Sequence, residues 1–235
     1  MSKPIIQLND ISASYGKRLA LEKVNLTVFD DDYLGVIGPN GGGKTTLMKI
    51  ILGLKKATKG TIQYFRDGKP VEELTMGYLP QYNKIDHRFP ISVYEVVLSG
   101  LNRQKRLFRP YTKQQHQQVE ATMQRLQLEN LRNRPIGELS GGQLQRVLLS
   151  RAIVSKPDVI ILDEPNTYID KRFQEQMYEI LNEIHRDCAI IIVSHDVAEI
   201  LQNVKHIACV NQHVHYHETA HLDSEKLEEH FLHIF

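Results

Sequence analysis

The sequence has little that a membrane-spanning or secreted protein requires. In 235 residues the longest unbroken apolar run covers six residues, 188–193, whereas a helix that crosses a membrane needs about 20. Near the N-terminus, Lys3 is followed only by Ile5 and Ile6 before polar residues return, so the apolar segment of a secretory signal is missing. We therefore expect a soluble, cytosolic, globular chain that does not itself enter a bilayer.

Net charge and cysteine content are also low. The 29 Lys and Arg residues nearly balance the 28 Asp and Glu residues, which leaves a net charge of +1. Electrostatics therefore give no case for bulk nucleic-acid binding. The two cysteines, Cys188 and Cys209, both lie in apolar stretches. A buried disulfide between them is one interpretation, but we favour two buried thiols in a reducing cytosol.

Apolar patterning predicts an α/β fold with a helical insertion. Short apolar segments, each followed by a helical pattern, favour a largely parallel sheet covered on both faces. Apolar residues recur at helical spacing over about residues 91–134, which predicts a helical subdomain inserted in the α/β core. The predicted strands are residues 5–15, 19–29, 33–37, 61–65, 76–79, 159–162 and 190–193, with a hairpin over 205–217. The predicted helices are residues 46–54, 143–155, 173–184 and 227–235.

The strongest motif is GPNGGGKT at residues 38–45, which matches G-x-x-x-x-G-K-[ST] between a predicted strand and a predicted helix. Its glycines allow backbone N–H groups to surround a phosphate, and the following helix adds its positive end. Lys44 would reach the β- and γ-phosphates, and the Thr45 hydroxyl would bind Mg²⁺. The alternative is a glycine-rich turn with a chance Lys-Thr pair, which this context disfavours. The predicted phosphate-binding residues are Gly38, Pro39, Asn40, Gly41, Gly42, Gly43, Lys44, Thr45 and Thr46.

Two carboxylates end the predicted strand at residues 159–162. Asp163, at the strand tip, lies where it can hold Mg²⁺ directly or through water. Glu164 is then placed to polarise an attacking water as a general base, a role that contributes a factor of about 10²–10⁴. The alternative is an acidic turn after a buried strand. The presence of the phosphate loop in the same chain disfavours this alternative.

A second glycine pair lies in the segment LSGGQ at residues 139–143. Ser140 is a good helix N-cap, and the glycines leave N–H groups unobstructed at a helix start, which indicates a second anion site. One nucleotide does not need two phosphate cradles in one subunit, so we expect this cradle to close over ATP bound to another copy. An ordinary N-cap with a flexible glycine pair is the alternative. The residues of this predicted cradle are Ser140, Gly141, Gly142 and Gln143.

With these motifs in this order, the chain resembles the nucleotide-binding subunit of an ATP-binding cassette (ABC) transporter over about residues 5–217. The resemblance implies that Tyr15 stacks on adenine, and that Gln81 contacts Mg²⁺ and water and hinges the helical subdomain. It also implies that Asp170 lies in a loop that crosses the dimer interface, and that His195 contacts the γ-phosphate. Taken singly, the four residues could instead be a packed strand aromatic, a turn residue, a helix cap, and a cap or buried histidine.

Three positions depart from the family's pattern. Gly42 stands where alanine is commonest, Tyr168 stands where a small residue is usual, and the hairpin turn at 211–212 lacks the usual glycine. We expect Gly42 to loosen the phosphate loop without removing a ligand. The geometry of the interface loop around Tyr168 is left open.

The resemblance also implies an architecture and a chemistry. The fold would be a P-loop ATPase (RecA-like) core with an antiparallel β subdomain and an inserted α-helical subdomain. The chain would be one nucleotide-binding domain, with about residues 1–80 and 138–235 as the core and β subdomain, and about 82–137 as the helical subdomain that contacts a permease. ATP would be hydrolysed with Mg²⁺ as cofactor. The expected catalytic residues are Glu164, His195, Lys44 and Gln81, and the expected Mg²⁺ ligands are Thr45, Gln81 and Asp163.

The implied assembly is a homodimer that powers a separate integral membrane permease at the cytoplasmic face of the inner membrane, supplied by an extracytoplasmic substrate-binding protein. The segment around Phe89 and Pro90 resembles ATPase subunits of zinc and manganese importers, so we favour a divalent metal cation as the substrate. The alternatives are a siderophore or haem importer, and a soluble ABC ATPase such as one for iron–sulfur cluster assembly. A regulatory nucleotide-binding module without catalysis is disfavoured because its chemistry would not need all of Lys44, Asp163, Glu164 and His195, which are present.

Histidines are concentrated toward the C-terminus. Seven of the eleven lie between His206 and His233. On a strand, His213, His215 and His217 would share one face, where three imidazoles could bind Zn²⁺. We favour a solvated polar strand face instead, because no carboxylate or cysteine ligand is fixed by the spacing.

Overall fold

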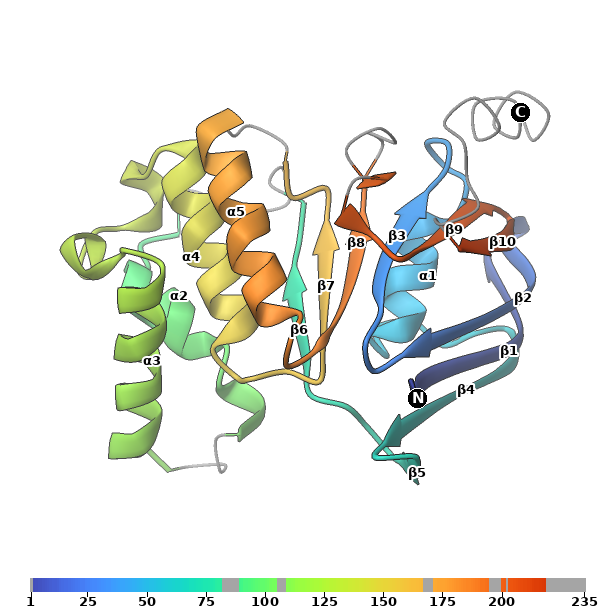
Figure 1. Ribbon diagram of the computed structural model, residues 1–235, viewed down its shortest axis with the longest axis horizontal. Helices are drawn as coiled ribbons and strands as arrows, with labels where there is room; N and C mark the ends of the chain where they lie inside the picture. Colours follow the sequence, from blue (N-terminus) through green and yellow to red (C-terminus); the bar gives the residue numbers. More distant parts are fainter. Residues whose placement is uncertain are drawn as a thin grey trace. The chain divides into compact units, whose positions relative to one another are not determined.

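The computed structural model describes residues 2–81, 89–104, 109–166, 171–194, 200–201 and 203–218, and Figure 1 shows the fold. The chain forms two compact units. Unit 1 contains Met1–Leu74 and His185–Phe235, and unit 2 contains Thr75–Ile184. Among the described residues, no helix combines the length and the apolar character needed to cross a membrane.

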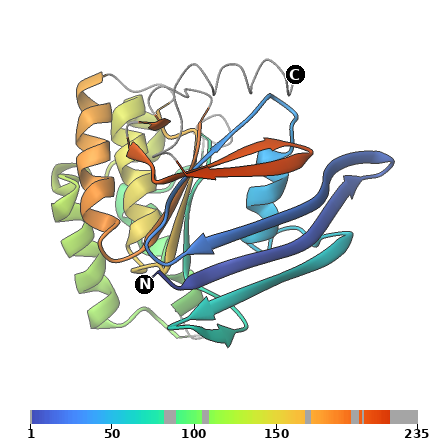
Figure 2. The same cartoon turned by 45° about the vertical axis from the view of Figure 1, so that its right-hand side comes forward.

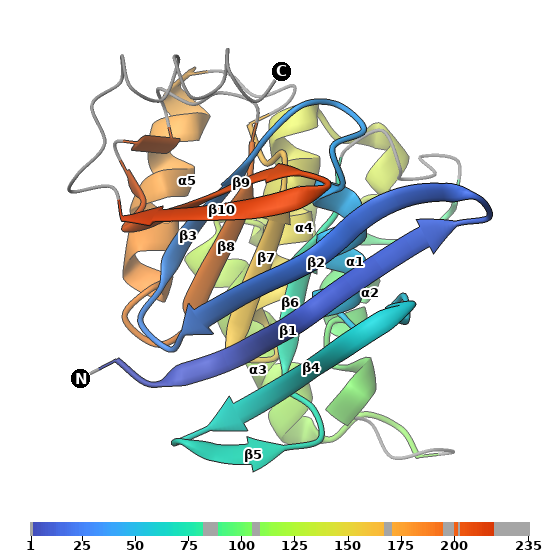
Figure 3. The same ribbon diagram turned by 90° about the vertical axis from the view of Figure 1, so that its right-hand side faces the viewer.

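An antiparallel sheet forms one part of unit 1, with its strands in the order β2-β1-β4-β5 (Figure 3). In the long β1–β2 hairpin, visible in Figure 2, Tyr15 pairs with Arg18 across a turn at Gly16. Alternate residues of β2, among them Val24 and Leu26, are buried, as in a sheet with one packed face. The strands are β1 (Pro4–Tyr15), β2 (Arg18–Phe29), β4 (Lys59–Arg66) and β5 (Lys69–Val71).

Parallel strands form the other part of unit 1. β3 pairs in parallel with β8 and with β9, and β10 pairs antiparallel with β9. Every residue of β3 and β8 is buried, which explains their continuous apolar sequences. Helix α1 follows β3 and is largely buried. The elements are β3 (Tyr33–Ile37), α1 (Lys44–Ile51), β8 (Ala189–Val193), β9 (His206–Asn211) and β10 (His213–Glu218).

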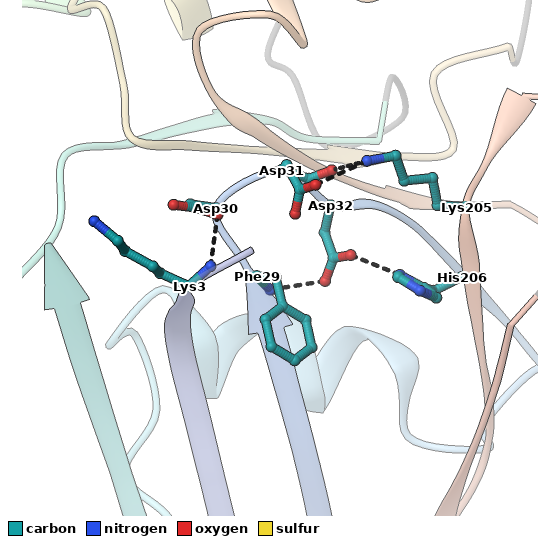
Figure 4. A network of polar contacts seen from close by, with 7 residues as sticks. All are labelled: Lys3, Phe29, Asp30, Asp31, Asp32, Lys205 and His206. Carbon is teal, nitrogen blue, oxygen red and sulfur yellow. Dashed lines mark hydrogen bonds and ion pairs between the residues drawn. The ribbon is translucent and has the colours of Figure 1, made fainter. Parts of the chain in front are cut away.

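The turn between β2 and β3 is a hydrogen-bonded junction (Figure 4). Asp32 is fully buried, accepts a hydrogen bond from the Phe29 N–H at 2.7 Å, and lies 2.6 Å from His206 Nδ1. Burial raises the pKa of Asp32, and its contacts with Phe29 and His206 oppose that rise. Asp31 accepts from Lys205 Nζ at 3.0 Å. The turn therefore fixes the start of β9 to the junction of β2 and β3.

Unit 2 combines two parallel strands with helices. β6 pairs in parallel with β7, so Gly77 lies opposite Ile160 and Leu79 opposite Leu162. Helices α2, α3 and α4 pack together through apolar residues that the helical spacing predicts to be internal, including Val97. The elements are β6 (Met76–Leu79), α2 (Val93–Ser99), α3 (Lys113–Arg125), α4 (Gly141–Ile153), β7 (Val159–Asp163) and α5 (Lys171–Ile184), with 3₁₀ turns at Asn102–Gln104, Glu129–Leu131 and Ile136–Glu138.

The mixed α/β fold, the predicted strands and the C-terminal hairpin are confirmed, and the structure corrects several details. Helix α1 starts earlier than predicted, at Lys44, and also ends earlier, at Ile51. Strand β5 was not predicted, because three residues containing Pro70 at a sheet edge carry no alternating pattern. The predicted helix at 227–235 lies outside the described residues.

The two cysteines are free and buried, so the thiol interpretation is confirmed. Cys209 lies within β9, and Cys188 directly precedes β8. Burial raises the pKa of the Cys209 thiol to about 11, which keeps it protonated at neutral pH.

Candidate functional site

The predicted phosphate loop lies in unit 1, between the end of β3 at Ile37 and the start of α1 at Lys44. Gly38, Gly41 and Gly43 adopt positive φ angles of 144°, 83° and 110°. Only glycine reaches such angles without strain. The sequence therefore forms here the tight backbone turn that a phosphate cradle requires.

Lys44 lies folded over this loop. Its Nζ donates to the Gly38 carbonyl at 2.7 Å and to the Pro39 carbonyl at 2.9 Å, and the residue is only 7% exposed. The ammonium group is thus held at the loop where phosphate oxygens would bind.

The first turn of α1 presents further groups. Thr45 is exposed and Thr46 is buried. The N-cap residue is Gly43, which supplies no side-chain acceptor to the first N–H groups of the helix. Such N–H groups at a helix start suit an anion. The loop and the helix start therefore offer donors and hydroxyls from residues 38–46 to a single phosphate chain.

Neighbouring backbone closes around the loop glycines. A Cβ on Gly42 would lie 2.7 Å from the Val210 carbonyl oxygen, and one on Gly43 would lie 2.5 Å from the Ala20 carbonyl oxygen. In addition, the Gln212 N–H donates to the Gly42 carbonyl at 2.7 Å. The packing leaves no room for a side chain at Gly42, so the expectation that Gly42 loosens the loop is not supported by this geometry.

Tyr15 ends β1 and is 49% exposed, so it is not packed into the sheet as an ordinary strand aromatic. Lys55 Nζ lies 4.0 Å from the centroid of its ring, within the range of a cation–π interaction, and donates to the Ser14 carbonyl at 3.1 Å. Lys55 was not singled out from the sequence, because nothing in its local pattern links it to Tyr15 across 40 residues. The ring is available for stacking, as an adenine platform requires.

The predicted catalytic residues Gln81 and Glu164 lie in unit 2, at the carboxyl ends of β6 and β7. Gln81 Nε2 donates to Glu164 Oε2 at 2.8 Å. Parallel pairing of the two strands places their ends side by side, which brings these residues together. Glu164 has a φ of +52°, a left-handed conformation that is uncommon outside glycine. The structure thus orients the predicted base with a neutral donor.

Asp163 is 4% exposed, and its Oδ2 accepts from the Tyr78 hydroxyl at 3.3 Å. Burial and the Asp163 carboxylate raise the pKa of Tyr78, so the phenol stays protonated and donates. Tyr78 is a second residue that sequence reasoning missed. Its place in a predicted strand was clear, but its partner was not.

The predicted cradle also lies in unit 2. Ser140 caps α4: its hydroxyl accepts from the Gln143 N–H at 3.3 Å, and its own N–H donates to Gln143 Oε1 at 3.0 Å. This reciprocal capping box fixes the start of the helix. Ser140 is exposed, so the helix start is open to a ligand. Asp170, Tyr168 and His195 lie outside the described residues.

The alternating histidines can be compared with the metal-site prediction where the structure describes them. Within the described ranges, no group of three or more His, Cys, Asp or Glu side chains is arranged to hold a metal ion. His213 instead lies 3.1 Å, through Nδ1, from the Glu22 carbonyl oxygen, and His213 and His215 are both exposed. A solvated strand face agrees with the structure at His213 and His215, whereas His217 is half-buried.

A phosphate loop before one helix and a buried strand that ends in two carboxylates define the class of P-loop nucleotide hydrolases. A family model described as ABC transporter matches residues 21–167. The chain belongs to the ABC transporter family and is an ATP-binding and ATP-hydrolysing subunit of it.

Individual relatives agree with this assignment, and a solved structure shares the fold. The chain is 36% identical over 224 residues to the zinc uptake system ATP-binding protein ZurA of Listeria monocytogenes, covering 93% of this chain and 87% of that protein. It is 33% identical over 214 residues to the zinc import ATP-binding protein ZnuC of Haemophilus influenzae, covering 90% and 74%. A dimeric ATP-binding cassette in a post-hydrolysis state, bound to ADP and phosphate, has a TM-score of 0.77 at 22% identity, covering 92% of this chain and 99% of that one.

Proposed function

We propose that two copies of this chain hydrolyse ATP to drive the import of zinc through a separate integral membrane permease. The observation that carries the proposal is the Gln81–Glu164 hydrogen bond, which orients a carboxylate for general-base chemistry. The zinc assignment is supported by relatives that are named as zinc uptake and zinc import ATP-binding proteins. The same names favour zinc over the siderophore, haem and iron–sulfur alternatives, and over a protein without catalysis.

Each ATP is proposed to lie between the phosphate loop of one copy and residues Ser140–Gln143 of the other. Residues 38–46 would hold the phosphates, with the Lys44 ammonium already at the loop. Tyr15 would stack on the adenine. Ser140 and the N–H groups of Gly141 and Gly142 would contact the γ-phosphate from the partner copy.

The proposed metal is Mg²⁺, and the chemistry of the donor set fits it. Thr45, Gln81 and Asp163 offer only oxygen ligands, which a hard cation prefers. Bound there, Mg²⁺ would neutralise negative charge on the phosphates. Glu164 accepts a proton from the attacking water, while Gln81 Nε2 donates a hydrogen bond to Glu164 Oε2 and holds the carboxylate in place. His195 would contact the γ-phosphate, and Asp170 would lie at the interface between the copies.

The segment of about residues 82–137 is proposed to contact the permease at the cytoplasmic face of the inner membrane. A separate extracytoplasmic protein would deliver the metal to the permease. Phe89 supports this, because its side chain is 60% exposed just before the capping box of Ser92 and Glu95 at the start of α2. A large exposed apolar residue beside a fixed helix start suits a protein contact.

The proposal is tested by measuring uptake of radioactive zinc in a deletion strain that carries either the wild-type gene or Lys44→Ala. We expect the wild type alone to restore zinc uptake, and the tagged protein to co-purify with a polytopic membrane protein. Manganese uptake is measured in parallel. Restored manganese uptake with unchanged zinc uptake would overturn the substrate, and unchanged uptake of both metals would overturn metal import.

A further inference from the structure

Gln145, in the second turn of α4, is buried in an unusual way. The residue is 2% exposed, and its Nε2 donates to the Pro165 carbonyl at 2.8 Å. Its other amide atom, Oε1, is buried without a hydrogen-bond partner among the described residues. A buried acceptor left unsatisfied lowers stability. An apolar residue would avoid this cost but would remove the donor to the Pro165 carbonyl, so the glutamine serves that hydrogen bond.

The hydrogen bond connects two functional segments of unit 2. Pro165 directly follows Glu164, and Gln145 lies on the helix that Ser140 caps. Glu164 has a left-handed backbone, so its orientation depends on restraint from the neighbouring backbone. Gln145 supplies such a restraint one residue away, while Gln81 restrains the Glu164 side chain itself.

One further contact holds the same segment, and a second joins the two helices. Asn166 Nδ2 donates to the Tyr178 hydroxyl of α5 at 3.1 Å, and Arg146 Nη2 of α4 donates to Gln176 Oε1 of α5 at 3.1 Å. The segment 164–166 is therefore attached to α4 through Gln145 and to α5 through Asn166. A shift of α4 would be passed to the backbone beside Glu164.

We propose that Gln145 is a positioning residue that ties the orientation of Glu164 to the seating of α4. The proposal rests on the proposed function, in which the start of α4 engages the nucleotide of a second copy. Engagement fixes α4, and the Gln145–Pro165 hydrogen bond then fixes the backbone that carries the base. Hydrolysis in each copy is thereby linked to the contact that the same copy makes with its partner's nucleotide.

The first test compares Gln145→Met with wild type in steady-state hydrolysis of Mg-ATP by the full chain. Methionine fills a similar volume but cannot donate to Pro165. We expect kcat to fall about tenfold while KM changes less than about twofold, because the residues that bind nucleotide are untouched. The matched control is Gln118→Met, since Gln118 also donates to a backbone carbonyl, that of Val154, far along α4 from Ser140. This control should keep the wild-type kcat.

The second test separates positioning from damage to the cradle. In the Glu164→Gln background, adding Gln145→Met should leave the ATP-dependent dimer intact, as measured by size-exclusion chromatography. Gln145→Glu tests whether a restored donor rescues activity. Only a protonated carboxyl group can donate to the Pro165 carbonyl, so the ATPase activity of this variant relative to wild type should rise as pH falls.

These outcomes distinguish the possible failures. A wild-type kcat for Gln145→Met, or the same loss for Gln118→Met, would overturn the inference. Loss of the dimer in the double variant would show that Gln145 only supports the cradle, which also overturns it. If wild type itself did not hydrolyse ATP, the proposed function would fail instead.

Discussion

Gln81 and Glu164 are 83 residues apart in the sequence, yet their side chains share a hydrogen bond of 2.8 Å. The bond joins the ends of two adjacent parallel strands, β6 and β7. A neutral donor on one carboxylate oxygen fixes the direction of the carboxylate without removing its charge. We therefore expect Gln81 to influence turnover.

Gln81→Met is expected to lower kcat about 10- to 100-fold, the range that the loss of a hydrogen bond to a charged group produces. Methionine retains the length of the side chain but cannot donate to Glu164. Initial rates over a series of ATP concentrations give kcat and KM separately. A variant that retained wild-type kcat would show that the carboxylate is oriented by other groups.

Glu164→Gln is expected to bind ATP and stop turnover, and so to accumulate an ATP-bound dimer. The amide keeps the size of the side chain but cannot accept the proton of water. Size-exclusion chromatography with and without Mg-ATP measures the dimer, and phosphate release measures turnover. A monomeric variant that still hydrolysed ATP at the wild-type rate would contradict the assignment of the base.

Tyr15→Ala is expected to raise KM for ATP about 5- to 100-fold with little change in kcat, because stacking of one base contributes about 1–3 kcal/mol. Tyr15→Phe should resemble wild type, since it keeps the ring. Lys55 covers one face of the ring, so adenine would use the other, and Lys55→Met should change KM less than about threefold. Equal KM values for wild type and Tyr15→Ala would remove Tyr15 from the nucleotide site.

Acidification is expected to destabilise the protein through His185. Burial lowers the pKa of His185 below its ordinary value of 6.5, and its ring packs 5.4 Å from that of Tyr33. A histidine whose pKa is lower in the folded state than in the unfolded state stabilises the folded protein at pH values above the unfolded-state pKa. That contribution is lost as pH falls below about 6.5 toward the lower folded-state pKa.

Melting temperatures between pH 8 and pH 5 check this prediction. His185→Gln should lose less stability on acidification than wild type, although it is less stable at pH 8. The control is His215→Gln, which makes the same replacement at an exposed histidine. Parallel profiles for wild type and His185→Gln would exclude His185 as the cause.

The sequence predicts the elements of this fold better than the contacts between them. Strand β6 has the predicted bounds, and the phosphate loop lies between the predicted strand and helix, because local patterns determine both. The Gln81–Glu164 contact depends on which strands are neighbours, and that pairing is set by packing across the whole unit. No local pattern could reveal it.

Two departures from the family's pattern illustrate the same limit. Gly42 and Gln212 look unrelated in the sequence, but the Gln212 N–H donates to the Gly42 carbonyl at 2.7 Å. Gln212 also adopts a φ of +61°, the conformation for which a glycine was expected. The Val210 carbonyl fills the space beside Gly42. The hairpin turn and the phosphate loop therefore fit each other in a way that only the structure shows.

The central claim is that each chain carries two halves of different nucleotide sites. The direct measurement mixes two inactive variants, Lys44→Ala and Gly142→Asp. Aspartate is tolerated in a first helical turn but would repel a nucleotide phosphate at the cradle. In a mixed dimer, one site combines the intact loop of one chain with the intact cradle of the other. Random pairing should therefore restore about a quarter of wild-type ATPase activity. If the mixture remains as inactive as its components, the shared site is wrong.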